Sequence, residues 1–426
     1  MFKNLLKQDY TLTFLVIILT ILGIISIYST GQSYEGSRQI IFAIVGIIAY
    51  FSLLSVDYRI YKDKKVQILI YAVIIIMLGL IFLLNIRLNN TRRWFVIGKF
   101  DIQPAEFAKI VVILISASFF EVFRKTENAL KKIALGFLII VPIVYLIYKQ
   151  PALGNTIIIL VIWFAIVFAS YYDQKKFIYI ISIFILSILL ILPFIGINFL
   201  NANLNLIFFN VNILLLIIIL GLIFLLYKKA SKNIYKYILF ITIILGIFVG
   251  FSFKLIVWDH LLKNYQKNRL IGFIDQSSKL NSSINFQTEQ SKIAIGSGGL
   301  WGKGYLEGTQ SRLNFLPEDT TDFIFATIVE EFGLIGTLIL LSLYLAFIYR
   351  IIHILKNTRG RYETLIVIGV LTMIMIQFII NVGMNLGVMP VTGITLPLIS
   401  YGGSSLLTIL ICLGILQNIY IQRKNY

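Results

Sequence analysis

Asp322 stands where a polar segment meets a long apolar run, a position at which a carboxylate can do chemistry or cap a helix. The surrounding sequence, LPEDTTDFIF at 316–325, changes from polar to apolar within a few residues. The helix dipole would stabilise the carboxylate there, whereas partial burial would raise its pKa. Asp322 is therefore either a residue near a helix N-cap or a general base. Glu330 and Glu331 lie deeper in the run, and we expect at least one of them to pair inside the protein or to line a polar cavity.

A second group of polar residues combines cations with an aromatic ring, at Arg92, Arg93 and Trp94. Paired arginines suit bidentate binding of phosphate, so we expect a site for a phosphorylated head group. The alternative is an anchor in which Trp94 lies at a membrane surface. Glu106 and Lys109 follow on one face of an expected helix. They either form a structural ion pair or contact an anionic substrate.

A glycine-rich segment, IGSGGLWGKG at 295–304, is the third feature. Successive glycines permit positive φ and close backbone approach, so the segment is either an anion-binding nest or a set of tight turns. The Walker A pattern would require glycine in place of Ser297 and Ser or Thr in place of Gly304, so ATP hydrolysis is not indicated.

The segment from 381 to 405 carries Pro390, Pro397 and paired glycines, which exclude a straight helix. A broken or re-entrant segment is tolerated in a membrane only where it faces protein or a wet cavity, so we expect a cavity wall here. The two histidines, His260 and His353, are far apart in sequence, which argues against a His-based zinc site and against a serine nucleophile. The single cysteine, Cys412, excludes an intramolecular disulfide.

The elements that must position these residues follow from composition. Of 426 residues, 59% are hydrophobic and 13% charged. The apolar residues form continuous runs of bilayer-spanning length, which predicts an all-α, polytopic transmembrane helix bundle forming a single integral-membrane domain over 1–426 and excludes a β-barrel. Twelve spans are expected, near 11–30, 38–56, 66–86, 104–121, 133–148, 154–170, 177–197, 204–227, 237–257, 322–349, 362–385 and 400–421.

The net charge of +18 could indicate nucleic-acid binding, but the positions of the 37 basic residues argue otherwise. Most of them, 22, lie in every second connection, near 3–7, 59–65, 124–132, 175–176, 228–236, 350–361 and 423–424. By the positive-inside rule both termini are cytoplasmic, and no nucleic-acid partner is expected. Three longer or unusually polar connections, 87–103, 258–321 and 386–403, then lie outside, and 258–321 forms a large extracytoplasmic loop.

Taken together, these motifs resemble the SEDS family of polytopic cell-wall polymerases, which contains RodA and FtsW. The matching strings are RRW at 92–94, QPAEFAK at 103–109, YQKNR at 265–269, QSKIAIGSGGLWGKG at 290–304, LPEDTTDFIF at 316–325 and the segment 383–405. GKGYLEGTQ at 302–310 favours the RodA branch. Two departures stand out: QPALG at 150–154 lacks a carboxylate that the family often has, and ten spans are typical. An extra helix pair is therefore expected within about 177–257.

The resemblance implies a peptidoglycan glycosyltransferase that polymerises lipid II at the outer face of the bacterial cytoplasmic membrane, for cell elongation and shape. It implies Asp322 as the catalytic base, in agreement with one of the two interpretations above. The candidate substrate-binding residues are Arg92, Arg93, Trp94, Glu106, Lys109, Lys303, Gln310, Arg312 and Glu331.

The resemblance also implies partners: a class B penicillin-binding protein, since this chain has no transpeptidase domain, and other membrane proteins of the elongation complex. A divalent cation such as Mg²⁺ or Mn²⁺ could assist, although no carboxylate cluster demands one. Two alternatives remain open at this stage. A lipid II flippase would need the cationic cavity but no base, and a non-catalytic scaffold would tolerate loss of Asp322.

Overall fold

The computed structural model describes residues 7–83, 93–97, 100–122, 129–150, 152–171, 282–313 and 315–423, together with Lys267, Arg269 and Phe273. The chain divides into two compact units, one of residues 1–170 and 272–426 and one of residues 171–271. Arg92, the three spans expected within 177–257 and the inserted helix pair lie outside the described residues. The helices and strands below all belong to the first unit.

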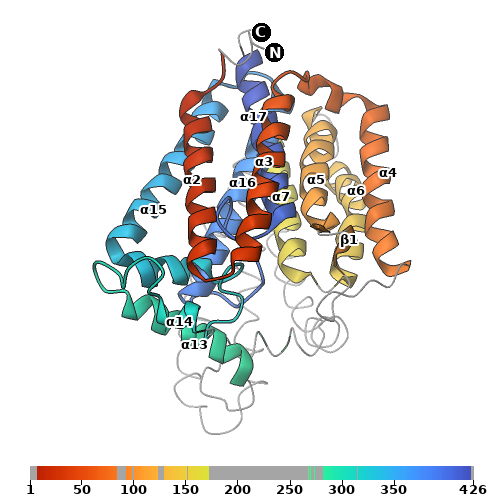
Figure 1. Cartoon of the computed structure of the whole chain (residues 1–426). Helices are drawn as coiled ribbons and strands as arrows, with labels where there is room; N and C mark the ends of the chain where they lie inside the picture. The colour runs from red at the N-terminus through yellow and green to blue at the C-terminus, as the bar shows by residue number, and fades with distance from the viewer. Residues whose placement is uncertain are drawn as a thin grey trace, which may run out of the picture. The chain divides into compact units, whose positions relative to one another are not determined.

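The regular secondary structure in the described part of this unit is helical apart from one hairpin (Figure 1). Its helices are α2 (Tyr10–Ser29), α3 (Ser33–Leu53), the 3₁₀ helix η1 (Tyr58–Lys62), α4 (Lys64–Leu83), α5 (Pro104–Glu121), α6 (Ala129–Lys149), α7 (Leu153–Ser170), α13 (Ser282–Ser297), α14 (Thr309–Arg312), α15 (Ile324–Asn357), α16 (Arg361–Asn385) and α17 (Gly403–Gln422). Strands β1 (Phe95–Ile97) and β2 (Phe100–Ile102) pair antiparallel, with Phe95 opposite Ile102.

Eight of the described helices are long and apolar enough to cross a membrane, namely α2, α3, α4, α6, α7, α15, α16 and α17. Each matches a span expected from the sequence. Helix α5 occupies the expected range 104–121, and Pro104 begins it, since the first turn of a helix needs no N–H there. The prediction of a polytopic helical bundle is therefore confirmed.

Helix α17 is buried along nearly its whole length and packs against α3 (Figure 1). Glycines make this approach close. A Cβ added to Gly46 would lie 2.3 Å from Leu410, and one added to Gly414 would lie 2.9 Å from the carbonyl oxygen of Tyr50. The two helices therefore form a closely packed pair against which the polar connections are held.

A buried polar network joins α2, α15 and α17 near the chain termini. Asp9 caps α2 by accepting a hydrogen bond from the Leu12 amide at 3.0 Å, and the same side chain forms an ion pair with Arg350. Gln417 donates to the Asp9 carbonyl oxygen at 2.9 Å. Because each buried polar group in this network has a partner, it stabilises the packing of three spans without exposing charge to lipid.

Candidate functional site

Asp322 lies directly before α15, as predicted, and its main chain is held from α16. The carbonyl oxygen of Asp322 accepts hydrogen bonds from Asn381 Nδ2 and Asn385 Nδ2, each at 3.0 Å. Its half-buried carboxylate faces Gly393, where an added Cβ would lie 3.4 Å from Asp322 Oδ2. Two asparagines one helical turn apart thus hold the main chain from which the carboxylate projects.

The connection 386–402 is irregular, as its prolines and glycines predict, and it lies against protein. Ser400 Oγ donates to the Thr321 carbonyl oxygen at 2.6 Å, and the Tyr401 amide donates to that of Thr320 at 2.8 Å. The end of the connection is therefore hydrogen-bonded to the residues that lead to Asp322, so that this irregular backbone lies against protein, as a helical membrane protein requires.

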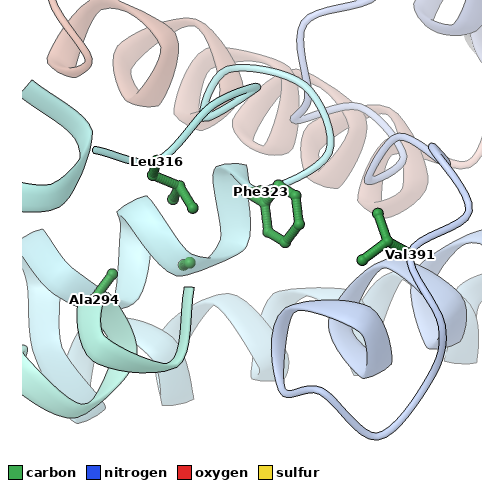
Figure 2. Packing of buried hydrophobic residues seen from close by; sticks show 5 residues of the cluster. Ala294, Leu316, Phe323 and Val391 are labelled. Atoms are coloured by element: carbon green, nitrogen blue, oxygen red, sulfur yellow. The ribbon is translucent and has the colours of Figure 1, made fainter. Parts of the chain in front are cut away.

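A small apolar cluster packs at this junction (Figure 2). Phe323 of the α15 entry packs with Ala294 of α13, Leu316 and Val391, and all four are at least 94% buried. Ala326 completes the cluster. Because the cluster draws side chains from three separate segments, it couples α13 and the 386–402 connection to the residue that precedes α15.

Asp319, three residues before Asp322, was missed by the sequence reasoning. Its side chain is 2% exposed and its Oδ2 atom has no hydrogen-bond partner, while Gln32 Nε2 lies 3.5 Å from Oδ1. Burial raises the pKa of Asp319 to about 7, and the neighbouring Glu35 carboxylate adds to the rise. Nothing in the sequence pattern distinguishes Asp319 from the exposed Glu318 beside it.

The glycine-rich segment pairs with a break in α15. Gly333 has φ 63° and ψ −162°, so helical hydrogen bonding is interrupted there. The amides of Lys303 and Gly304 donate to the carbonyl oxygens of Glu330 and Glu331, both at 3.0 Å. At these two residues the geometry favours tight turns over an anion-binding nest, because both amides already donate to carbonyl oxygens of α15.

Glycine is required at this contact. Gly302 has φ +81°, and a Cβ added there would lie 2.1 Å from the carbonyl oxygen of Glu331. A Cβ on Gly298 would lie 2.2 Å from the carbonyl oxygen of Val329. The run of glycines therefore allows one backbone to lie directly on another.

Glu330 organises the loop that follows. Its fully buried carboxylate accepts from Lys303 Nζ at 2.6 Å, from the Thr309 amide at 2.9 Å and hydroxyl at 3.0 Å, and from the Gln310 amide at 3.0 Å. The expectation that at least one of the two adjacent glutamates pairs inside the protein is confirmed. The negative charge of Glu330 thus compensates the positive charge of Lys303.

The other predicted residues in this region are Glu331, the next residue of α15, and Gln310 and Arg312 of the loop. Glu331 is 1% exposed and lies beneath Gly308, where an added Cβ would be 3.4 Å from its Cγ. Arg312 is exposed and donates from Nη1 to the Leu306 carbonyl oxygen at 2.7 Å. Gln310 keeps a buried side-chain oxygen without a hydrogen-bond partner. Arg312 is thus the exposed cation of this group.

Glu106 and Lys109 form an ion pair at 2.7 Å, with side chains 8% and 0% exposed. Lys109 Nζ also lies 3.4 Å from Asn155 Oδ1 of α7. Of the two interpretations of this pair, the geometry favours the structural one, because the ammonium is enclosed and compensated where it enters the bundle.

Arg93 and Trp94 lie directly before β1. Arg93 Nε donates to the carbonyl oxygen of Gln150 at 3.0 Å, at the connection between α6 and α7. Trp94 is half-buried beside it. On the other side of the hairpin, Ser404 Oγ donates to the Asp101 carbonyl oxygen at 3.2 Å and accepts from the Gln103 amide at 2.9 Å. The hairpin is thus anchored to α17.

Within the described ranges, no group of three or more His, Cys, Asp or Glu side chains is placed to hold a metal ion.

Comparison with known proteins places these features in a family. Residues 7–211 and 208–425 match the model of the FtsW, RodA and SpoVE family, described as cell cycle proteins. The chain is 34% identical to the peptidoglycan glycosyltransferase RodA of Treponema pallidum, covering 96% of this chain and 97% of that protein. It is 28% identical to the peptidoglycan glycosyltransferase MrdB of Escherichia coli K12, covering 99% and 96%.

Two solved structures share the fold. The rod shape determining protein RodA of Thermus thermophilus superposes with a TM-score of 0.61 at 23% identity, covering 99% of both chains. A chain from a peptidoglycan synthase complex, described as coordinating polymerization and crosslinking, gives a TM-score of 0.70 at 24% identity, covering 98% of this chain and 99% of that one.

Proposed function

This chain belongs to the FtsW, RodA and SpoVE family and is a polytopic bacterial membrane protein with peptidoglycan glycosyltransferase activity, and from that premise we propose its reaction and its site. It joins lipid II units into glycan strands at the outer face of the cytoplasmic membrane and releases undecaprenyl pyrophosphate, for cell elongation. Both termini are then cytoplasmic, as the distribution of basic residues indicates.

Asp322 is the proposed general base, and its geometry is the observation that carries the proposal. The acceptor sugar hydroxyl attacks the anomeric carbon of the donor, the bond from that carbon to the pyrophosphate oxygen breaks, and the hydroxyl proton passes to Asp322. A base must be held in place while it remains accessible. Asn381 and Asn385 fix the main chain of Asp322, and its side chain is only half-buried.

Cations must stabilise the departing pyrophosphate. We assign this role to Arg92, Arg93 and Arg312, with Trp94 and Gln310 contacting the sugar or lipid portion. The Lys303 side chain is 25% exposed, and we assign it to the edge of this group of pyrophosphate-binding cations.

The buried predicted residues take a different part. Lys109 is enclosed and paired with Glu106, and Glu331 is 1% exposed. We therefore assign all three to the framework that holds the site rather than to direct contact with substrate.

A class B penicillin-binding protein is the proposed partner, since the glycan strands must be crosslinked by a transpeptidase, a reaction distinct from the polymerisation proposed here. The similar chain in a complex described as coordinating polymerization and crosslinking supports this assignment. Other membrane proteins of the elongation complex would join the same assembly.

The test is polymerisation of lipid II by the purified protein with its partner, whose transpeptidase is blocked. Asp322→Asn is compared with wild type and with Glu307→Gln, which alters an exposed carboxylate of the loop that precedes Asp322. Loss of a general base lowers the rate by roughly 100- to 10,000-fold, while the control variant is expected to retain the wild-type rate.

The outcomes separate the candidate functions. Equal strand formation by Asp322→Asn and wild type would remove Asp322 as the base. No strands from wild type, together with lipid II movement across vesicle bilayers that Asp322→Asn preserves, would favour a flippase. No strands and no lipid II movement, with partner binding intact, would favour a scaffold.

A further inference from the structure

Helix α15 is longer than a membrane is thick. Its 34 residues would extend about 51 Å as a continuous helix, against a hydrocarbon core of about 30 Å. The break at Gly333 divides it, and the part from Leu334 to Asn357 is about 36 Å long, sufficient to span the bilayer by itself. The basic residues Arg350 and Lys356 lie at the far end of that part. One membrane boundary therefore falls near Gly333.

The glycine-rich segment is hydrogen-bonded at this level. The amide of Leu334 donates to the Gly299 carbonyl oxygen at 2.9 Å, and that of Ile335 donates to the Leu300 carbonyl oxygen at 3.2 Å. These are the amides that the helix break would otherwise leave unpaired. Leu300 thus lies beside the first membrane-facing turn of α15, and backbone groups that lipid could not satisfy are already paired.

The side chains at this point are large, apolar and exposed. Leu300 is 62% exposed and Trp301 is 80% exposed, and we refer to these two residues as the apolar tip. The exposed apolar face of α15 continues from the same level through Leu334, Ile335, Leu338 and Ile339. The nearby Tyr305 ring lies 6.4 Å from that of Phe332. One continuous apolar surface therefore includes the tip and the span.

We propose that the apolar tip, Leu300 and Trp301, inserts into the boundary between head groups and acyl chains of the membrane leaflet next to Gly333. The occupant of this surface is lipid. Three observations select it: the tip is level with the end of a span, its surface is continuous with the lipid-facing side of that span, and no charged residue occurs between Ser297 and Gly302. Tryptophan at an apolar edge is the residue that favours this depth.

The neighbouring charge fits this placement. Lys303, the first cation after the tip, is directed to the buried Glu330 carboxylate at 2.6 Å. The insertion anchors the loop that carries Lys303, Gln310 and Arg312 at a fixed height over the bilayer. This proposal requires only that the protein spans a membrane, so it stands or falls independently of the reaction proposed above.

Spin-label depth in nanodiscs that hold one chain each tests the proposal. The single cysteine, Cys412, is buried, so Cys412→Ala provides a background for labelling. Trp301→Cys is compared with Leu338→Cys on the lipid-facing side of α15 and with Glu307→Cys on the exposed loop. We expect oxygen collisions to exceed nickel-chelate collisions at 301, as at 338, and the reverse at 307.

Two results would overturn the proposal. A label at 301 as accessible to the nickel chelate as the label at 307 would place the tip in water. A label protected from both reagents would mean that protein covers it. A second measurement avoids the cysteine variants: in brominated-lipid bilayers Trp301→Phe should lose part of the quenchable fluorescence of wild type, and an unchanged quenched fraction would contradict insertion.

Discussion

Replacing Glu330 with glutamine should release the loop 303–312 from α15. The carboxylate is 0% exposed and accepts hydrogen bonds from an ammonium, two backbone amides and a hydroxyl. The glutamine side chain would remove the negative charge and place an NH₂ donor opposite some of these donors. Breaking a buried ion pair costs about 3–5 kcal/mol. Lys303 is 25% exposed and can be partly hydrated, which places the expected cost at the lower end, about 3 kcal/mol.

Hydrogen exchange measures this cost locally. The amides of Thr309 and Gln310 both donate to Glu330, so their exchange reports the opening of the loop. A loss of about 3 kcal/mol corresponds to roughly a hundredfold faster exchange, since each 1.4 kcal/mol is about tenfold. Exchange in Glu330→Gln at the wild-type rate would refute the assignment of Glu330 as the residue that holds this loop.

A matched control and a double variant isolate the pair. Lys62 and Glu121 form an ion pair of the same 2.6 Å length, but with side chains 50% and 19% exposed, so Glu121→Gln should cost less than about 1 kcal/mol. Combining Glu330→Gln with Lys303→Met should cost less than the sum of the single changes by more than about 1 kcal/mol, because neither residue is then left with a lone charge. Simple additivity would contradict the coupling.

Two further predictions concern the thermal unfolding temperature of the purified protein. Burial raises the folded-state pKa of Asp319 from its ordinary 3.8 to about 7, so its contribution to stability, up to about 4 kcal/mol, should be lost as pH rises from about 4 through 7. Asp319→Asn should therefore reduce the fall in stability between about pH 5 and 8, and an unchanged slope would contradict this prediction. Gly302→Ala should destabilise the folded protein by more than about 1 kcal/mol, since the added Cβ would lie 2.1 Å from the Glu331 carbonyl oxygen. Gly296→Ala has open space around it and should be nearly neutral, so equal effects of the two variants would refute the close-contact argument.

The sequence predicts the location of most described helices because a bilayer-spanning run is a local property of composition. Its boundaries fail where tertiary contacts extend a helix beyond its apolar part. The expected span 38–56 begins at Ser33 in the structure. Its first turns are polar, and two of their side chains bond to other segments: Arg38 pairs with Asp101 at 2.8 Å and Gln39 donates to the Ser400 carbonyl oxygen at 3.1 Å.

The site was predictable in part. The position of Asp322 before a helix follows from an abrupt change in polarity, and the irregular 386–402 segment follows from its prolines and glycines. The break at Gly333 was not predicted, because a single glycine in an apolar run is common and harmless. What makes it a break is the second backbone, at Gly299–Gly304, which accepts and donates the hydrogen bonds that the helix loses.

By itself, the sequence determined that this protein is a helical membrane protein, since hydropathy can be read along the chain, and the order of its motifs resembles that of the peptidoglycan polymerase family. Only the tertiary structure decided which ionisable groups are compensated. Lys303 and Glu330 are paired, and so are Asp9 and Arg350, whereas Asp319 is enclosed with an oxygen that lacks a hydrogen-bond partner. The energy of a charge depends on the atoms packed around it, and those atoms come from segments that sequence spacing does not bring together.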